Sequence, residues 1–106
     1  MLNTKQRAYL KSLAMNTEPV YQIGKNSLTP EFVEGIIECL EKRELIKISV
    51  LKNCADDARD LAQILSERTR SEIVQVIGKK IVLYKESKEH KKIELPKVKK
   101  TVSGNV

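Results

Sequence analysis

The sequence contains few aromatic residues and only one histidine. Its 106 residues include three tyrosines, one phenylalanine and no tryptophan. Proteins that read unpaired bases by stacking usually present paired aromatic side chains, and these four are too scattered to predict such a platform. His90 has no neighbour in the sequence that would complete a catalytic dyad. The sequence therefore predicts neither an aromatic stacking surface nor an enzyme.

Cysteines and long apolar runs are equally scarce. Cys39 and Cys54 do not have the spacing of a metal site and provide no disulfide framework, so we expect both thiols to be reduced. No apolar run approaches the roughly 18 residues that a membrane-spanning helix needs, and the first residues do not resemble a signal peptide. We expect a cytoplasmic monomer that uses no metal, cofactor, small-molecule substrate or membrane.

Positive charge, in contrast, is abundant. Twenty lysines and arginines against 14 acidic residues give a net charge of +6, which favours a polyanionic partner. The length and a hydrophobic content of 41% predict one domain with a modest core. We expect this domain to span residues 1–85, followed by a basic, mostly flexible tail over 86–106 that is ordered near Ile93 and Leu95.

Hydrophobic periodicity predicts an α/β fold. The expected helices span 4–15, 30–42 and 55–69, and the expected strands span 20–23, 45–51, 72–77 and 81–85. Asn3 and Thr29 are good helix caps, and Gly78-Lys79-Lys80 is typical of a hairpin tip. The order α-β-α-β-α-β-β predicts one mixed four-stranded sheet packed with helices.

Apolar stripes predict which faces are buried. We expect Tyr9 in the first helix and Ile64 in the third to lie on buried sides, and Lys47 and Ser49 to lie on the wetter face of their strand. The second helix has an acidic side that would repel phosphate and that a nucleic-acid surface should avoid. This side consists of Glu31, Glu34, Glu38 and Glu41.

The stretch 20–32 is the strongest candidate for a functional site, because it predicts a strand, a turn carrying Lys25, and a helix start. We expect Gly24 to have the positive φ of a sharp turn. Thr29 and Pro30 favour a helix start whose free N–H groups point back toward Lys25 and attract a phosphate. An ordinary strand-to-helix connection would use the same residues, and the turn is not a Walker A loop.

Three segments, 24–29, 44–47 and 76–84, together resemble the CRM domain (chloroplast RNA splicing and ribosome maturation) in its stand-alone bacterial YhbY form. The resemblance covers about residues 2–85. It implies a fold like the C-terminal domain of translation initiation factor three and binding to RNA. For stand-alone members, it also implies association with precursors of the large ribosomal subunit.

The family's signature loop is G-x-x-G, which is likened to the phosphate-clamping loop of KH domains. Here Ser27 replaces the second glycine, adding a side chain where backbone and RNA would approach most closely. We expect an RNA-binding protein that assists ribosome assembly through this clamp and a basic surface; the alternative is a basic adaptor that binds an acidic protein. The predicted RNA-binding residues are Gly24, Lys25, Asn26, Ser27, Arg7, Lys11, Lys79 and Lys80.

Overall fold

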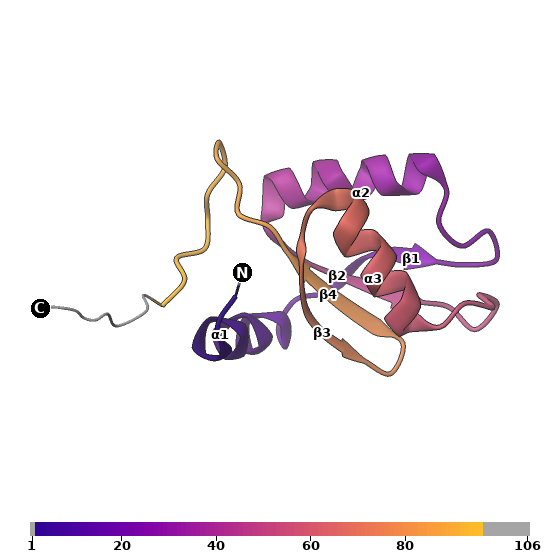
Figure 1. Cartoon of the computed structure of the whole chain (residues 1–106), viewed down its shortest axis with the longest axis horizontal. Helices are drawn as coiled ribbons and strands as arrows, with labels where there is room; N and C mark the ends of the chain where they lie inside the picture. The colour runs from indigo at the N-terminus through magenta and orange to yellow at the C-terminus, as the bar shows by residue number, and fades with distance from the viewer. Residues whose placement is uncertain (1, 97–106) are drawn as a thin grey trace, which may run out of the picture.

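A four-stranded mixed sheet forms the middle layer of the computed structural model, which describes residues 2–96 (Figure 1). The helices are α1 (Thr4–Ala14), α2 (Pro30–Arg43) and α3 (Ala58–Thr69), and the strands are β1 (Pro19–Ile23), β2 (Leu45–Val50), β3 (Glu72–Ile77) and β4 (Lys80–Tyr84). The predicted order of elements and the α/β class are confirmed. None of the helices in the described part of the chain is long and apolar enough to cross a membrane.

The strands are arranged in the order β1-β2-β4-β3. β1 and β2 are parallel and joined by α2, whereas β4 is antiparallel to both of its neighbours. β2 and β3 therefore run in the same direction with β4 inserted between them. As a result, β1, β2 and β3 all end at the edge of the sheet where the β3–β4 hairpin turns.

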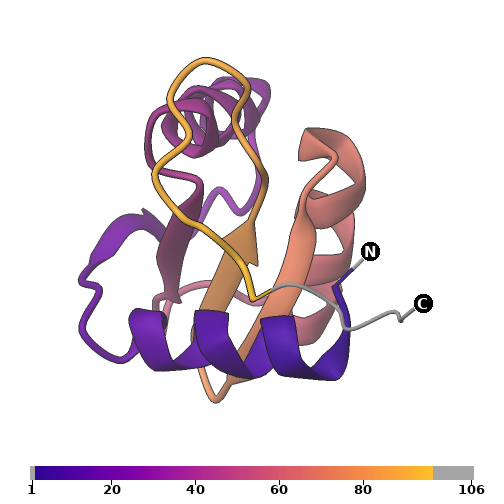
Figure 2. The same cartoon turned by 90° about the vertical axis from the view of Figure 1, so that its left-hand side faces the viewer.

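Each face of the sheet is covered by helix, and each has its own core. On one face α2 and α3 pack against residues such as Ile46, Ile48 and Ile81. On the other face α1 places Leu10 and Ala14 against the sheet (Figures 1 and 2). This second core contains Leu10, Ala14, Leu45, Val74, Val82 and Tyr84, with Leu2, Leu13, Ile93 and Leu95 packed around it.

The coverage by α1 corrects one expectation about β2. Ser49 is buried and Lys47 is half-buried, so the face predicted to be wet is largely enclosed. Two apolar side chains, in contrast, are more exposed than the sequence predicted. Tyr9 and Ile64 are each 38% exposed, because they lie at the margins of their helical stripes.

The predicted helix caps of α1 and α2 are confirmed. The Asn3 side chain accepts a hydrogen bond from the backbone N–H of Gln6 at 2.7 Å, and Thr29 Oγ1 accepts one from the N–H of Phe32 at 3.0 Å. α3, however, begins three residues later than expected, at Ala58 with Asp57 as its cap. The Asp57 side chain accepts a hydrogen bond from the N–H of Arg59 at 3.1 Å and so fixes the start of the helix there.

The chain does not detach from the domain after β4. Residues 86–96, called the C-terminal segment below, pass across one end of the domain between α2 and α1 (Figure 2). Ile93 and Leu95 pack against the α1 core, which confirms the predicted order near them. Residues 86–96 are thus packed where a mostly flexible tail was predicted, while the rest of that tail, 97–106, lies outside the described residues.

A buried carboxylate holds this segment. Glu44 has no exposed surface, and its oxygens accept hydrogen bonds from the backbone N–H groups of Ser87, Lys92 and Ile93 at 2.7–2.8 Å. Burial alone would raise the pKa of Glu44, but these amides and the charge of Lys91 favour the ionised form and hold its pKa below the usual value. Glu44 therefore acts as a fixed structural anion.

Candidate nucleic-acid interface

Three connections meet where β1, β2 and β3 end. The loop after β1 and the loop after β2 are joined by a hydrogen bond from the N–H of Leu51 to the carbonyl of Ile23 at 2.8 Å. The hairpin turn joins them through the N–H of Val50, which donates to the carbonyl of Lys79 at 2.7 Å. We call this edge the loop end of the sheet. Its exposed cations are Lys25, Lys52, Lys79 and Lys80.

The loop 24–27 is a tight turn, but its left-handed residue is not the predicted one. Ser27 donates its N–H to the carbonyl of Gly24 at 3.0 Å. Ser27 has a φ of 53°, whereas Gly24 has no positive φ, so the expectation for Gly24 is wrong. The positive φ falls on the fourth position of the loop, where the family signature has its second glycine. Glycine is favoured there because it adopts this backbone conformation without strain.

The side chain of Ser27 is also engaged. Its hydroxyl donates to Asp56 Oδ2 at 2.5 Å, which ties the loop after β1 to the loop after β2. This contact helps to fix the turn, but it also places a carboxylate beside it. A phosphate bound at the loop would have to lie on the side of Lys25, away from Asp56.

The start of α2 offers fewer free amides than the sequence predicted. Pro30 has no N–H, and the N–H of Phe32 already donates to the Thr29 hydroxyl. The N–H of Val33 donates to the Thr29 carbonyl. Anion binding at this end therefore depends more on the lysine side chains than on the first turn of the helix.

The hairpin presents its lysines as predicted. Gly78 has a φ of 55° and begins the turn, Lys79 completes it, and Lys80 is the first residue of β4. Both lysine side chains are exposed. The hairpin thus adds two positive charges to the loop end of the sheet.

The two predicted residues of α1 lie elsewhere. Arg7 is half-buried, and its guanidinium donates hydrogen bonds to the carbonyls of Ile73 and Val74, where the pairing of β3 with β4 shifts register. This is the start of β3, at the opposite end of the strand from the hairpin turn. Lys11 is exposed on α1. The structure therefore assigns Arg7 a role in holding α1 on the sheet edge and leaves Lys11 as a separate surface charge.

Lys52 is a cation that the sequence reasoning did not select. It follows β2 directly, and the Oδ1 of its neighbour Asn53 would lie 3.5 Å from a Cβ added at Gly24. The available signal was the parallel pairing of β1 and β2, since ligands of parallel sheets gather outside the carboxyl ends of the strands. Lys25 and Lys52 occupy those two ends.

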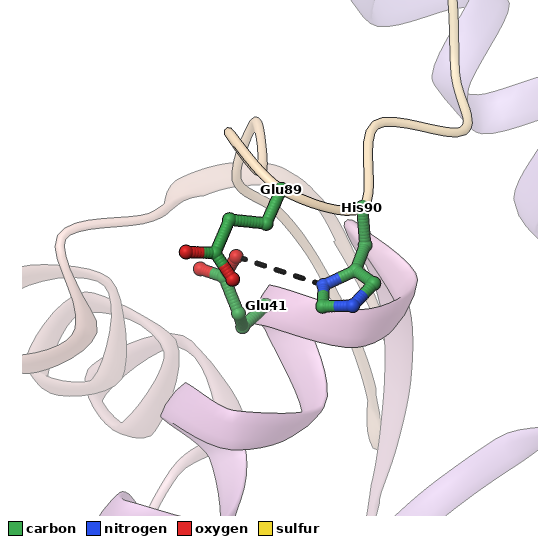
Figure 3. Close-up of side chains that lie close together, drawn as sticks. All are labelled: Glu41, Glu89 and His90. Carbon is green, nitrogen blue, oxygen red and sulfur yellow. Dashed lines mark ion pairs between the residues drawn. The ribbon is translucent and has the colours of Figure 1, made fainter.

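A second polar cluster joins α2 to the C-terminal segment (Figure 3). It contains Glu41, Glu89 and His90, all exposed, with their polar atoms within 4.8 Å of one another. Glu41 Oε2 accepts a hydrogen bond from Ser87 Oγ at 2.6 Å and lies 4.0 Å from His90 Nδ1. These contacts attach the C-terminal segment to α2, and this structural role explains why the three side chains lie together.

Comparisons with known proteins agree with this fold. The family model of the CRS1 / YhbY (CRM) domain matches residues 2–85. The chain is 51% identical to a Bacillus subtilis protein named "Probable RNA-binding protein YqeI" over 96 residues, covering 91% of this chain and all of that protein. It is 36% identical to an RNA-binding protein of Haemophilus influenzae, covering 91% of this chain and 96% of the relative.

A solved structure shows the same fold. The solution structure of the Staphylococcus aureus protein SAV1595, described as a candidate RNA binding protein, superposes with a TM-score of 0.76 at 56% identity, covering 91% of this chain and 100% of that one. The three segments that suggested the resemblance all lie inside the matched family region. The chain belongs to the CRS1 / YhbY (CRM) domain family.

Proposed function

We propose that this protein binds ribosomal RNA in precursors of the large ribosomal subunit and assists their assembly. The observation that carries the proposal is the group of exposed lysines at the loop end of the sheet, on a chain with a net charge of +6. The names of the relatives support RNA as the partner. The ribosomal target follows from the resemblance to stand-alone CRM proteins, and the proposal includes no catalytic step.

The proposed contact is a phosphate clamp of the strand-loop-helix type. Lys25 supplies a point charge beside the tight turn, and Lys52, Lys79 and Lys80 extend the positive surface over the neighbouring connections. Contacts of this kind position the RNA backbone and do not read its sequence. The proposed set is Gly24, Lys25, Asn26, Ser27, Lys52, Lys79 and Lys80, with Lys11 as an additional charge on α1.

The substitution Lys25→Ala tests the clamp. Filter binding of ribosomal RNA fragments over a series of salt concentrations should show weaker binding to every fragment, and the slope of log K against log salt should fall by about 1. Glu34→Gln, on the exposed acidic side of α2, is the control. If Lys25→Ala binds like the parent while Glu34→Gln changes affinity more, the loop is only a connection.

Two further measurements separate the proposal from an adaptor role. Binding to structured RNA should weaken steeply with salt and exceed binding to poly-glutamate, because RNA presents closely spaced phosphates. The protein should also sediment with precursors of the large subunit. A flat salt profile, or a preference for poly-glutamate, would contradict RNA binding and favour an acidic protein partner.

A further inference from the structure

A groove lies at the end of α2 opposite the proposed clamp. It has a volume of about 640 Å³ and lies between the end of α1, the end of α2 and the C-terminal segment. The view in Figure 2 faces the end of the domain that holds these three parts. The residues that line the groove are Leu13, Thr17, Lys42, Arg43, Leu45, Lys92 and Ile93.

The lining combines an apolar base with a cationic rim. Leu45 is buried, and Leu13 and Ile93 are half-buried, so these three side chains form the interior of the groove. Lys42, Arg43 and Lys92, in contrast, are exposed. No carboxylate lines the groove, although the segment contains three glutamates and α2 contains four.

Nearby negative charge is directed away from this groove. Glu44 is closest in sequence, but its carboxylate is enclosed by the amides of Ser87, Lys92 and Ile93. Glu41 contacts Ser87 and His90 on the part of the segment that does not line the groove. The groove therefore combines three positive charges with an apolar interior, which suits a ligand that is anionic and partly apolar.

We propose that this groove binds a nucleotide of single-stranded RNA, with its phosphate at Lys42, Arg43 and Lys92 and its base against Leu13 and Ile93. This inference rests on the proposed function and adds a second contact to it. α2 has 14 residues, so the groove and the loop 24–27 lie about 20 Å apart along the helix. An RNA strand that binds the clamp can reach the groove if it passes along a side of the molecule that avoids the acidic side of α2.

The chain's own remaining residues are a poor occupant. Residues 97–106 contain Lys97, Lys99 and Lys100 and no acidic residue, so their charge has the same sign as the rim of the groove. Charge complementarity instead favours a polyanion. An acidic peptide with an apolar side chain carries the same sign of charge as RNA. Binding of such a peptide in place of RNA is therefore one of the results that the test distinguishes.

The double substitution Lys42→Gln/Lys92→Gln tests the groove. Both side chains are exposed, and neither makes a hydrogen bond or ion pair within the described residues. Arg43 is kept because its positive charge acts on the half-buried Cys39 thiol and opposes the rise in the pKa of that thiol that burial causes. The matched control is Lys5→Gln/Arg68→Gln, which removes the same charge at exposed positions outside the groove.

The probe is an oligouridine long enough to pass both ends of α2. The groove variant should lose about tenfold or more in affinity at 0.1 M salt, and its salt slope should fall by about 2, whereas the control should change much less. In the parent, adding the probe should shift the backbone amide resonances of Lys42, Arg43, Lys92 and Ile93. The proposal would be overturned if the groove variant and the control lost equal affinity for the probe, or if the probe did not shift the resonances of these amides.

Other outcomes separate this inference from the proposed function. If Lys25→Ala weakens binding and the groove variant does not, the clamp stands and the groove inference fails. If the parent does not bind RNA at all, both fail. If poly-glutamate shifts the groove amides and oligouridine does not, the groove binds an acidic protein segment and the RNA assignment is wrong.

Discussion

Replacing Glu44 by glutamine would show how much the buried carboxylate contributes to stability. Glu44 Oε1 accepts the amides of Lys92 at 2.7 Å and Ile93 at 2.8 Å, and Oε2 accepts the amide of Ser87 at 2.7 Å. A glutamine has one carbonyl oxygen, which can keep the two amides at Oε1. Its NH2 group then replaces Oε2 and directs a donor toward the N–H of Ser87.

The expected loss follows from this geometry. The substitution removes one hydrogen bond to a charged acceptor, which is worth about 1.5–3 kcal/mol, and weakens the two that remain. Detachment of the C-terminal segment would limit the loss, because the freed amides can bind water. We therefore expect a destabilisation of about 2–3 kcal/mol, which for a domain of this size lowers the melting temperature by about 10–20 °C.

The effect should also depend on pH, with a defined sign. Because the folded-state pKa of Glu44 lies below its ordinary value of 4.5, its contribution is complete above that pH and is lost as pH falls through the folded-state pKa. Protonated Glu44 also carries no charge. The difference in stability between parent and Glu44→Gln should therefore shrink in acid.

Thermal unfolding followed by circular dichroism, from neutral pH to about pH 3, measures both effects. Amide hydrogen exchange at Ser87 locates the change, since that N–H loses its acceptor. Glu34→Gln makes the same charge change on an exposed side of α2 and should alter the melting temperature little. The reasoning is refuted if the Ser87 amide stays equally protected and the melting temperature of Glu44→Gln equals that of the parent.

Three further outcomes are expected. A chain ending at Lys85 should be about 2–3 kcal/mol less stable to urea than one ending at Pro96, because Glu44 exchanges its three amides for water and the packing of Ile93 and Leu95 is lost; equal stability would contradict a structural role for the segment. Gly35→Ala should destabilise, since the new Cβ would lie 2.8 Å from Tyr21 Oη, and adding Tyr21→Phe should recover part of the loss in the same urea assay. Burial, with the charges of Glu44 and Glu86, raises the pKa of Tyr84 from 10.0 to about 12. Between these pH values the unfolded state loses the phenolic proton and the folded state keeps it, so the parent should lose stability as the pH rises. Tyr84→Phe lacks this proton and should lose less stability over the same range.

Much of the fold could be predicted because its signals are local. The caps at Asn3 and Thr29 depend on residues three positions apart, and the apolar, β-prone runs of β2 and β4 are visible within five or six residues. The predicted lysines at 25, 79 and 80 also follow from short turns between regular elements. Such features need no knowledge of distant contacts.

The differences arise where distant parts of the chain meet. Arg7 donates to the carbonyl of Ile73, 66 residues away. The spacing of residues within α1 does not show that this side chain contacts β3. The amides that bind Glu44 belong to residues that follow it by 43 to 49 positions. Because no local pattern reveals these contacts, residues 86–96 were predicted to be a tail. Within the candidate site, the hydroxyl of the left-handed residue Ser27 donates to Asp56, 29 residues further along, a contact that the sequence of the loop alone does not indicate.

The position of β4 in the sheet has a consequence for folding during synthesis. β4 is the last strand to leave the ribosome, yet it lies between β2 and β3. Its side chains alternate between the two cores, Ile81 and Leu83 on the side of α2 and α3 and Val82 and Tyr84 on the side of α1. Before β4 emerges, β2 and β3 each have an unpaired edge and neither core can close. We therefore expect both cores to be completed only after β4 has emerged, which delays the closing of the sheet until nearly all of residues 2–85 have been made.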